Sequence, residues 1–222
     1  MKKLISLSCL MILFLVLISF KLCESGDKSN KISIDDFPMT VGSQWTYVRT
    51  DTLIRSIGRK EPIYVTELET VTVQVVRTDK RKRKEIVSEW VRMFNTEVDT
   101  QYVIFRKDTL EFTTSDNPAG SPFNFKIAFP IKFGNRWYGW YGEPPRDSFK
   151  VVLEESLKVA AGKFSQVYLI ERGTFIPNSL GYYKCWIVPE IGIVKMCRWG
   201  QNTLGGEYKV ENWDLIRYDI KK

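Results

Sequence analysis

The fold prediction rests on the stretch Phe129-Pro130-Ile131-Lys132-Phe133-Gly134-Asn135-Arg136-Trp137, because it repeats an earlier one. The earlier copy is Phe37-Pro38-Met39-Thr40-Val41-Gly42-Ser43-Gln44-Trp45. Both copies fit the pattern F-P-x-x-[VF]-G-x-x-W, and since 129 minus 37 is 92, they lie 92 residues apart. A comparable length of chain follows each copy. The sequence therefore indicates an internal duplication, with a first β unit at 37–128 and a second at 129–222 that pack as one globular domain.

The repeated motif has a structural interpretation. Proline fixes its own φ and pushes the preceding phenylalanine towards an extended conformation, and glycine can adopt the positive φ of a tight turn. The tryptophan then begins a strand and anchors the core. This interpretation covers Phe37, Pro38, Gly42 and Trp45 in the first copy, and Phe129, Pro130, Gly134 and Trp137 in the second.

The N-terminus predicts export. Lys2 and Lys3 precede an apolar run from Leu4 to Phe20, which is the layout of a signal peptide and is short for a membrane span. Cleavage after Ser25 is favoured, giving a signal peptide at 1–25 followed by a flexible tether at 26–36. Lipidation at Cys23 is the alternative, and only this would attach the protein to a membrane. The protein is therefore expected in the bacterial periplasm or at the cell surface.

Composition favours an all-β fold with at most one or two short helices. Aromatic residues make up 14% of the chain, and they are favoured, like Val, Ile and Thr, on half-buried pleated surfaces. Removal of residues 1–25 takes away three lysines and one glutamate, so the formal charge of +7 becomes +5. Such a mild positive charge on an exported protein does not indicate nucleic-acid binding.

Alternating side chains predict the strands. Val71, Val73 and Val75 alternate with polar residues between Ile63 and Val76. Glu67 interrupts this alternation, so we expect a β-bulge or a strand break near it. The whole is expected to form a curved antiparallel sheet or half-barrel.

Further hairpins are predicted downstream. Tyr102–Arg106 and Leu110–Thr114 form one pair, and Tyr182–Val188 and Ile193–Trp199 form another around a turn with Pro and Gly. Ser148–Ala161 fits both strand and helix spacing, and we predict a strand for most of it because a turn and a return strand follow.

Two segments are candidate binding surfaces. The aromatic run Trp137, Tyr138, Trp140 and Tyr141 fits either a plug at the end of a sheet, which is favoured, or a stacking surface for a glycan. The basic run that includes Lys82 and Arg83 fits a solvated hairpin tip, which is favoured, or a docking patch for anionic lipid or polysaccharide. If the protein has a site, the groove between the two β units is expected to hold it.

Cys185 and Cys197 are candidates for a disulfide. Both are equidistant from residue 191, so a hairpin centred there sets them opposite each other, within the Cα range that a disulfide accepts. Export would supply the oxidising compartment. A reduced pair in the core is the alternative.

No catalytic motif is present, and the sequence contains no histidine. This removes Ser-His and Cys-His nucleophiles and histidine-ligated zinc. Neighbouring carboxylates such as Glu154 and Glu155 would point to opposite sides of a strand. We expect no enzyme activity, no cofactor and no metal site.

Three motifs together resemble those of a group of exported bacterial β-rich domains, many of them lipoproteins. They are the duplicated F-P-x-x-x-G-x-x-W, Ala161-Gly162-Lys163-Phe164-Ser165-Gln166-Val167, and Pro189-Glu190-Ile191-Gly192-Ile193-Val194-Lys195. The resemblance implies a curved antiparallel sheet, distantly similar to the half-barrels of periplasmic lipoprotein carriers that hold acyl chains on a concave apolar face. It implies no catalytic residues. Phe20-Lys21-Leu22, ahead of Cys23, departs from the lipobox of such lipoproteins.

The function expected from these observations is non-enzymatic binding of a hydrophobic ligand, such as a lipid, or of an envelope partner on a concave sheet face. A structural or adhesive surface module is one alternative. Glycan binding through residues 137–141 is the other.

Overall fold

The structure is a computed structural model, and it describes residues 31–55, 63–81, 85–114, 125–139, 147–154, 156–174, 181–202 and 207–222. The strands of the first predicted unit are β2 (Gln44–Arg55), β3 (Ile63–Lys80), β4 (Ile86–Met93), β5 (Val98–Arg106), β6 (Thr109–Thr113) and β7 (Phe125–Ala128). Those of the second are β8 (Ile131–Lys132), β9 (Arg136–Gly139), β10 (Asp147–Glu154), β11 (Leu157–Val159), β12 (Gly162–Phe164), β13 (Val167–Thr174), β14 (Gly181–Val188), β15 (Gly192–Asn202) and β16 (Glu207–Asp219). Ahead of both lie β1 (Lys31–Ile32) and a short 3-10 helix, η1 (Ile34–Asp36).

Twelve of these strands form one antiparallel sheet, in the order β7-β6-β5-β4-β3-β2-β16-β15-β14-β13-β10-β9. The sheet consists of two six-stranded meanders, one from β2 to β7 and the other from β9 to β16, joined where β2 pairs with β16. Two small sheets, β1-β8 and β11-β12, complete the described strands. The prediction of an all-β fold built on a curved antiparallel sheet is confirmed.

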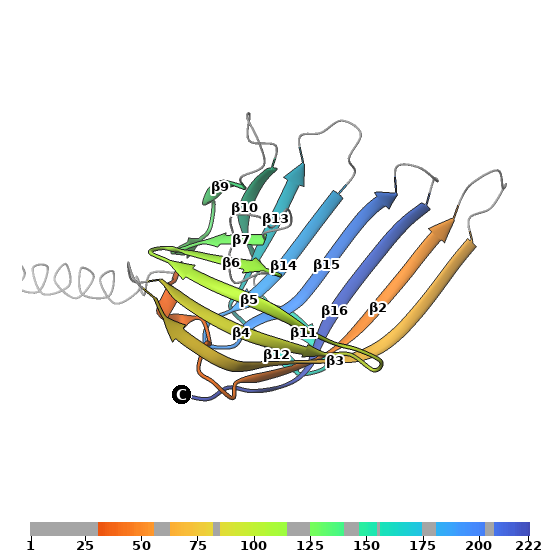
Figure 1. Ribbon diagram of the computed structural model, residues 1–222. Helices are drawn as coiled ribbons and strands as arrows, with labels where there is room; N and C mark the ends of the chain where they lie inside the picture. Colours follow the sequence, from red (N-terminus) through yellow and green to blue (C-terminus); the bar gives the residue numbers. More distant parts are fainter. Residues whose placement is uncertain are drawn as a thin grey trace, which may run out of the picture. The chain divides into compact units, whose positions relative to one another are not determined.

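The large sheet curls until its two end strands approach each other. In Figure 1, β4–β7 cross in front of β13–β16. At the seam, the indole N–H of Trp137 on β9 donates to the carbonyl oxygen of Lys126 on β7 at 3.0 Å. Interruptions in the ladders of β3 and β16 accompany the curvature: Val76 and Ile216 each lack a partner where the register shifts. Such bulges increase local twist and bend a strand.

The two motif copies share one hydrogen-bonding pattern. In the first copy, Gly42 N–H donates to Val75 O at 2.8 Å and Ser43 O accepts from Val75 N–H at 2.9 Å. In the second, Gly134 N–H donates to Val151 O at 3.1 Å and Asn135 O accepts from Val151 N–H at 2.9 Å. The glycines have φ values of 90° and 81°, as a left-handed turn residue requires.

The motif phenylalanines join the two meanders in the core. The Phe37 and Phe129 rings lie 6.4 Å apart in an edge-to-face arrangement, and both side chains are buried. Trp45 is also buried, and its indole N–H donates to Ile191 O at 2.7 Å across the interior. Buried aromatic rings with satisfied polar atoms give the base of the sheet a well-packed core.

Two local predictions need correction. β3 is continuous through Glu67, and its irregularity lies instead between Val75 and Arg77. Residues 31–36 of the predicted tether carry β1 and the 3-10 helix, and Ile32 is only 1% exposed, in the core. An apolar residue in a polar segment was the signal for this second feature.

The predicted hairpins are present. β5 and β6 pair around a turn at Lys107 and Asp108, and β14 and β15 pair around Pro189–Ile191. β10 and β11 occupy most of the ambiguous segment 148–161 as strands. Within the described part of the chain, no helix has the length and apolar character needed to cross a bilayer.

Candidate functional site

A path of aromatic rings crosses the interior of the curled sheet. Trp45 stacks on Trp90 at 4.9 Å, and Trp90 meets Phe112 edge-on at 6.0 Å. Phe112 lies 5.6 Å from Phe125, which lies 4.5 Å from Tyr183. These rings come from β2, β4, β6, β7 and β14, so the path runs from the first meander to the second. It supplies the apolar floor of the site.

A pocket of about 200 Å³ lies along this path. Its lining comes from both meanders and consists of Tyr47, Val73, Trp90, Arg92, Gln101, Phe112, Phe125, Tyr183, Ile193, Met196, Arg198, Glu211 and Trp213. Six of the thirteen are aromatic, and three are charged. The pocket thus combines an apolar floor with a polar edge, which is the usual character of a site that binds a small molecule.

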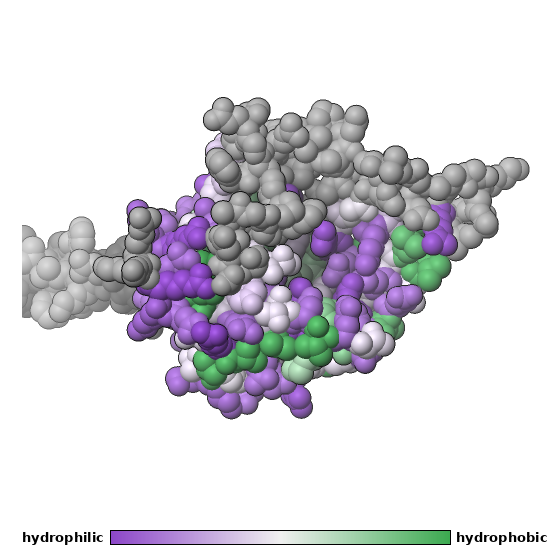
Figure 2. Space-filling model, in the orientation of Figure 1, coloured by the Kyte–Doolittle hydropathy of each residue, from purple (hydrophilic) through white to green (hydrophobic). Residues whose placement is uncertain are grey.

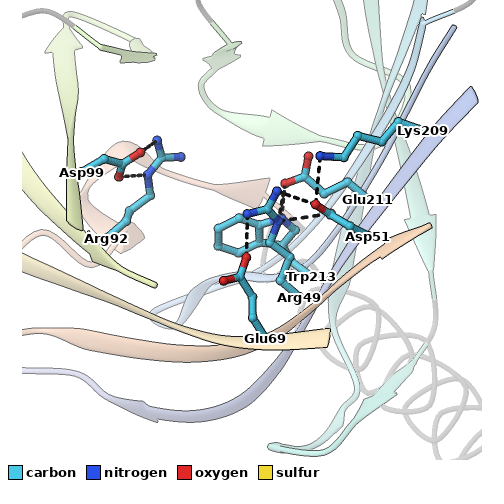
Figure 3. A network of polar contacts seen from close by, with 8 residues as sticks. All are labelled: Arg49, Asp51, Glu69, Arg92, Asp99, Lys209, Glu211 and Trp213. Carbon is cyan, nitrogen blue, oxygen red and sulfur yellow. Dashed lines mark hydrogen bonds and ion pairs between the residues drawn. The ribbon is translucent and has the colours of Figure 1, made fainter. Parts of the chain in front are cut away.

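The polar edge belongs to a network centred on Arg49 (Figure 3). The Arg49 guanidinium binds Asp51 at 2.6 Å, Glu69 at 2.7 Å and Glu211 at 3.3 Å. Lys209 Nζ also reaches Asp51, at 2.9 Å. Burial opposes the charge of Arg49, but the three carboxylates outweigh it and raise the pKa of Arg49. The guanidinium is therefore a permanent cation that holds three carboxylates in place.

The β4–β5 hairpin closes over this network. Phe94 at its tip meets Trp213 edge-to-face at 6.1 Å, and the Arg49 guanidinium lies 5.5 Å from the Phe94 ring. Below the tip, Arg92 forms a bidentate pair with Asp99, with hydrogen bonds of 2.7 and 2.6 Å. Cation–π contacts and paired charges hold the first meander against the second at the edge of the pocket.

Burial keeps the ionisable side chains of the interior in their protonated forms. Tyr47 donates its hydroxyl hydrogen to Ile193 O at 2.8 Å, and burial raises its pKa. Burial also raises the pKa of the Tyr183 hydroxyl, which donates to the Met196 sulfur at 3.4 Å. The Cys185 thiol is buried as well, and its pKa is raised for the same reason. These groups stay protonated at neutral pH and serve the packing.

The aromatic run at 137–141 is only partly described. Trp137 stacks on Phe149 at 5.4 Å with an interplanar angle of 6°, and its indole N–H is engaged across the seam. Tyr138, the next residue on β9, is 66% exposed. Adjacent strand residues point to opposite faces, so these two rings do not share one surface. Trp140 and Tyr141, and also Lys82 and Arg83 of the basic run, lie outside the described residues.

The predicted Cys185–Cys197 disulfide is wrong. Both cysteines are free, and Cys185 pairs in register with Met196 while Cys197 pairs with Lys184. Val188 pairs with Gly192, so the turn is centred on residue 190 rather than 191, and unpaired Val194 shifts the register by one residue beyond it. The two cysteines therefore lie on opposite faces of the sheet.

Sequence reasoning missed the charged network, although a signal was present. Trp45, Tyr47, Arg49 and Asp51 have the same parity on β2, so they share the concave face. The change from aromatic to charged residues along that row marks where the core ends and the pocket edge begins. No group of three or more potential metal-binding side chains occurs among the residues that the structure describes.

The surface contrasts with this interior. Figure 2 shows hydrophilic residues over much of the described part of one face, with hydrophobic residues gathered in a band over β3 and β4. Exposed hydrophobic side chains of the described chain include Val76 and Val98, at 39% and 67% exposure.

No protein-family model matches this chain, and no curated protein matches it. Two solved structures are similar to it. One is a presumed exported protein with a YmcC-like fold from Bacteroides fragilis, with 18% identity, a TM-score of 0.40, and coverage of 82% of this chain and 98% of that one. The other is a presumed lipoprotein from Parabacteroides distasonis, with 15% identity, a TM-score of 0.37, and coverage of 83% and 98%. A likeness of this degree concerns the outline of the fold and says nothing about function.

Proposed function

We propose that this is an exported, non-enzymatic protein that binds the apolar part of a small ligand in its interior pocket. The observation that carries the proposal is the pocket of about 200 Å³ on an aromatic floor, lined from both meanders. The signal-like segment at 1–25 supports export.

The volume limits what the pocket can hold. An apolar cavity of roughly 150 Å³ accepts benzene, and complete ligands of drug size occupy roughly 300–1,000 Å³. The pocket therefore has room for one aromatic ring or a short alkyl chain, and the rest of a larger ligand would remain outside. Rings such as Trp90 and Phe125 offer flat apolar surfaces to such a group.

The arrangement of the carboxylates supports binding rather than catalysis. Glycoside hydrolysis needs two carboxyl groups that can act as acid and base. Glu211 and Asp51 are both bound to Arg49, and Glu211 also accepts the indole N–H of Trp213 at 2.6 Å. Both carboxylates are thus engaged by neighbouring side chains, which suits a structural role.

A second candidate function is a structural or adhesive module. The observation that favours it is the single cluster of buried hydrophobic side chains, drawn from both meanders, that forms the core. Such a module would bind no small apolar molecule. The glycan-binding alternative stays a prediction, and a Trp140→Ala variant that kept full binding across a polysaccharide panel would count against it.

The test is a titration with fluorobenzene. Its binding is monitored through the broadening and shift of the ¹⁹F resonance. Burial of one aromatic ring contributes roughly 3 kcal/mol to the free energy of binding, which corresponds to a dissociation constant of about 6 mM. In a Val73→Phe variant a new ring enters the pocket, and binding should be lost. The control is Thr70→Phe, which adds the same ring to an exposed position on the same strand and should leave binding unchanged. If the wild-type protein does not change the resonance of fluorobenzene at about 10 mM or above, which exceeds the expected dissociation constant, the structural-module alternative is favoured.

A further inference from the structure

Arg198 lies at the mouth of the pocket. It belongs to β15, lines the pocket, and has an exposed side chain, so its guanidinium is where the pocket meets solvent. In register it faces Tyr183 on one side and Glu211 on the other. Its position is therefore fixed by the central part of the sheet rather than by a loop.

Arg198 differs from the other cations at this edge. Arg49 holds three carboxylates, Lys209 reaches Asp51, and Arg92 holds Asp99. Arg198 has neither an ion pair nor a hydrogen bond with any side chain in the described part of the chain, although Glu211 is its register partner. Glu211 is turned instead to Arg49 and to the indole of Trp213. Among the residues that the structure describes, Arg198 is thus the cation at the edge of the pocket whose donors are open to a ligand.

We propose that the ligand is a small amphiphilic monocarboxylate, whose apolar body enters the pocket and whose carboxylate binds Arg198. This inference rests on the proposed function of the pocket. A guanidinium presents paired N–H donors that match a carboxylate. One negative charge suits the site, because the Glu211 carboxylate beside Arg198 repels a second. A phosphate monoester, which carries nearly two charges at neutral pH, is disfavoured for that reason.

The test compares two ligands of the same shape, 3-(4-fluorophenyl)propanoate and 3-(4-fluorophenyl)propan-1-ol, by ¹⁹F NMR titration of the full mature chain. The wild-type protein should bind the acid about tenfold more tightly than the alcohol, as a charge-assisted hydrogen bond at a partly exposed site provides. In Arg198→Gln this ratio should fall to about one. Arg217→Gln removes the same charge at an exposed position of β16 outside the pocket, and it should keep the ratio.

The outcomes separate the two proposals. If neither compound binds, the pocket function itself is wrong. If both bind equally to the wild-type protein, or if Arg198→Gln keeps the preference for the acid, the carboxylate inference is overturned and the pocket function stands. An unchanged urea-unfolding midpoint of Arg198→Gln checks that this variant is folded. A preference lost equally in Arg217→Gln would point to net charge and would also overturn the inference.

Discussion

Gly192 offers a sharp test of how the first motif copy is packed. It begins β15, has φ of 87°, and a Cβ added there would lie 3.1 Å from Pro38 Cγ and 3.4 Å from Pro38 Cδ. Glu190 N–H also donates to Asp36 O at 2.9 Å, so the β14–β15 turn is held against the start of the motif. Alanine at 192 would strain the backbone and also press on a rigid proline ring.

Alanine substitutions at three glycines distinguish the backbone strain from the crowding of Pro38. Gly200 has no positive φ and an open surrounding, so Gly200→Ala should be neutral or stabilise the protein by about 0.5 kcal/mol. Gly134 has φ of 81° and no neighbour within 4 Å of an added Cβ, so Gly134→Ala should cost only the left-handed strain, roughly 1–2 kcal/mol. Gly192→Ala adds the crowding of Pro38, roughly 1–3 kcal/mol more.

Urea unfolding of the mature protein, followed by circular dichroism, measures these differences. In thermal unfolding followed by the same signal, each kcal/mol should lower the melting temperature by roughly 2–4 °C for a chain of this size. A double-mutant cycle with Pro38→Ala isolates the crowding, because the extra cost at Gly192 should disappear when the ring is removed. The reasoning is refuted if Gly192→Ala costs no more than Gly134→Ala, or if the cycle shows no coupling.

Three further predictions concern the cysteines and the charged network. Because Cys185 and Cys197 are free and on opposite faces, protein lacking residues 1–25 should unfold at the same urea concentration with and without reductant. Burial raises the pKa of Cys185, so this thiol should resist alkylation at pH 8 in the native state and react once urea unfolds the chain, as mass spectrometry would detect. Arg49→Met leaves Glu69 and Glu211 without their cation and Asp51 with Lys209 alone, and it should cost about 2–4 kcal/mol in urea unfolding. Arg217→Met should change stability by less than about 0.5 kcal/mol. Equal costs at the two arginines would show that the network does not stabilise the sheet.

The fold class could be predicted because its signals are local. Alternation around Val71–Val75 and the Pro and Gly at turns depend on neighbours in sequence, and most predicted strands are present. The bulge predicted near Glu67 is absent, and the parity of the strand explains why. Glu67 keeps the parity of the valines, and so does Glu69, which pairs with Arg49. The apparent break in phase is a change in the chemistry of the concave face along one continuous strand.

The register and the site could not be predicted from such local signals. The pairing of Cys185 depends on the exact centre of the turn and on unpaired Val194. Pro189 and Gly192 mark the turn in the sequence, but they mark neither its centre nor the unpaired residue. The pocket brings Trp90 and Phe112 together with Tyr183, which lie far apart in the sequence. Their proximity follows from how strongly the sheet curls, and this is a property of the whole sheet.

The positions of the two motif copies explain why the pocket lies where it does. Each motif copy begins a six-stranded meander, and Phe37 and Phe129 fix the two starting points against each other at the base. The first meander then curls across the second, so that rings from β4, β6 and β7 face β14–β16. One meander alone would expose its part of this aromatic path to water, at a cost of roughly 25 cal/mol for each Å² of apolar surface. Joining the two halves covers that surface and, in the same step, encloses the cavity beside Arg198.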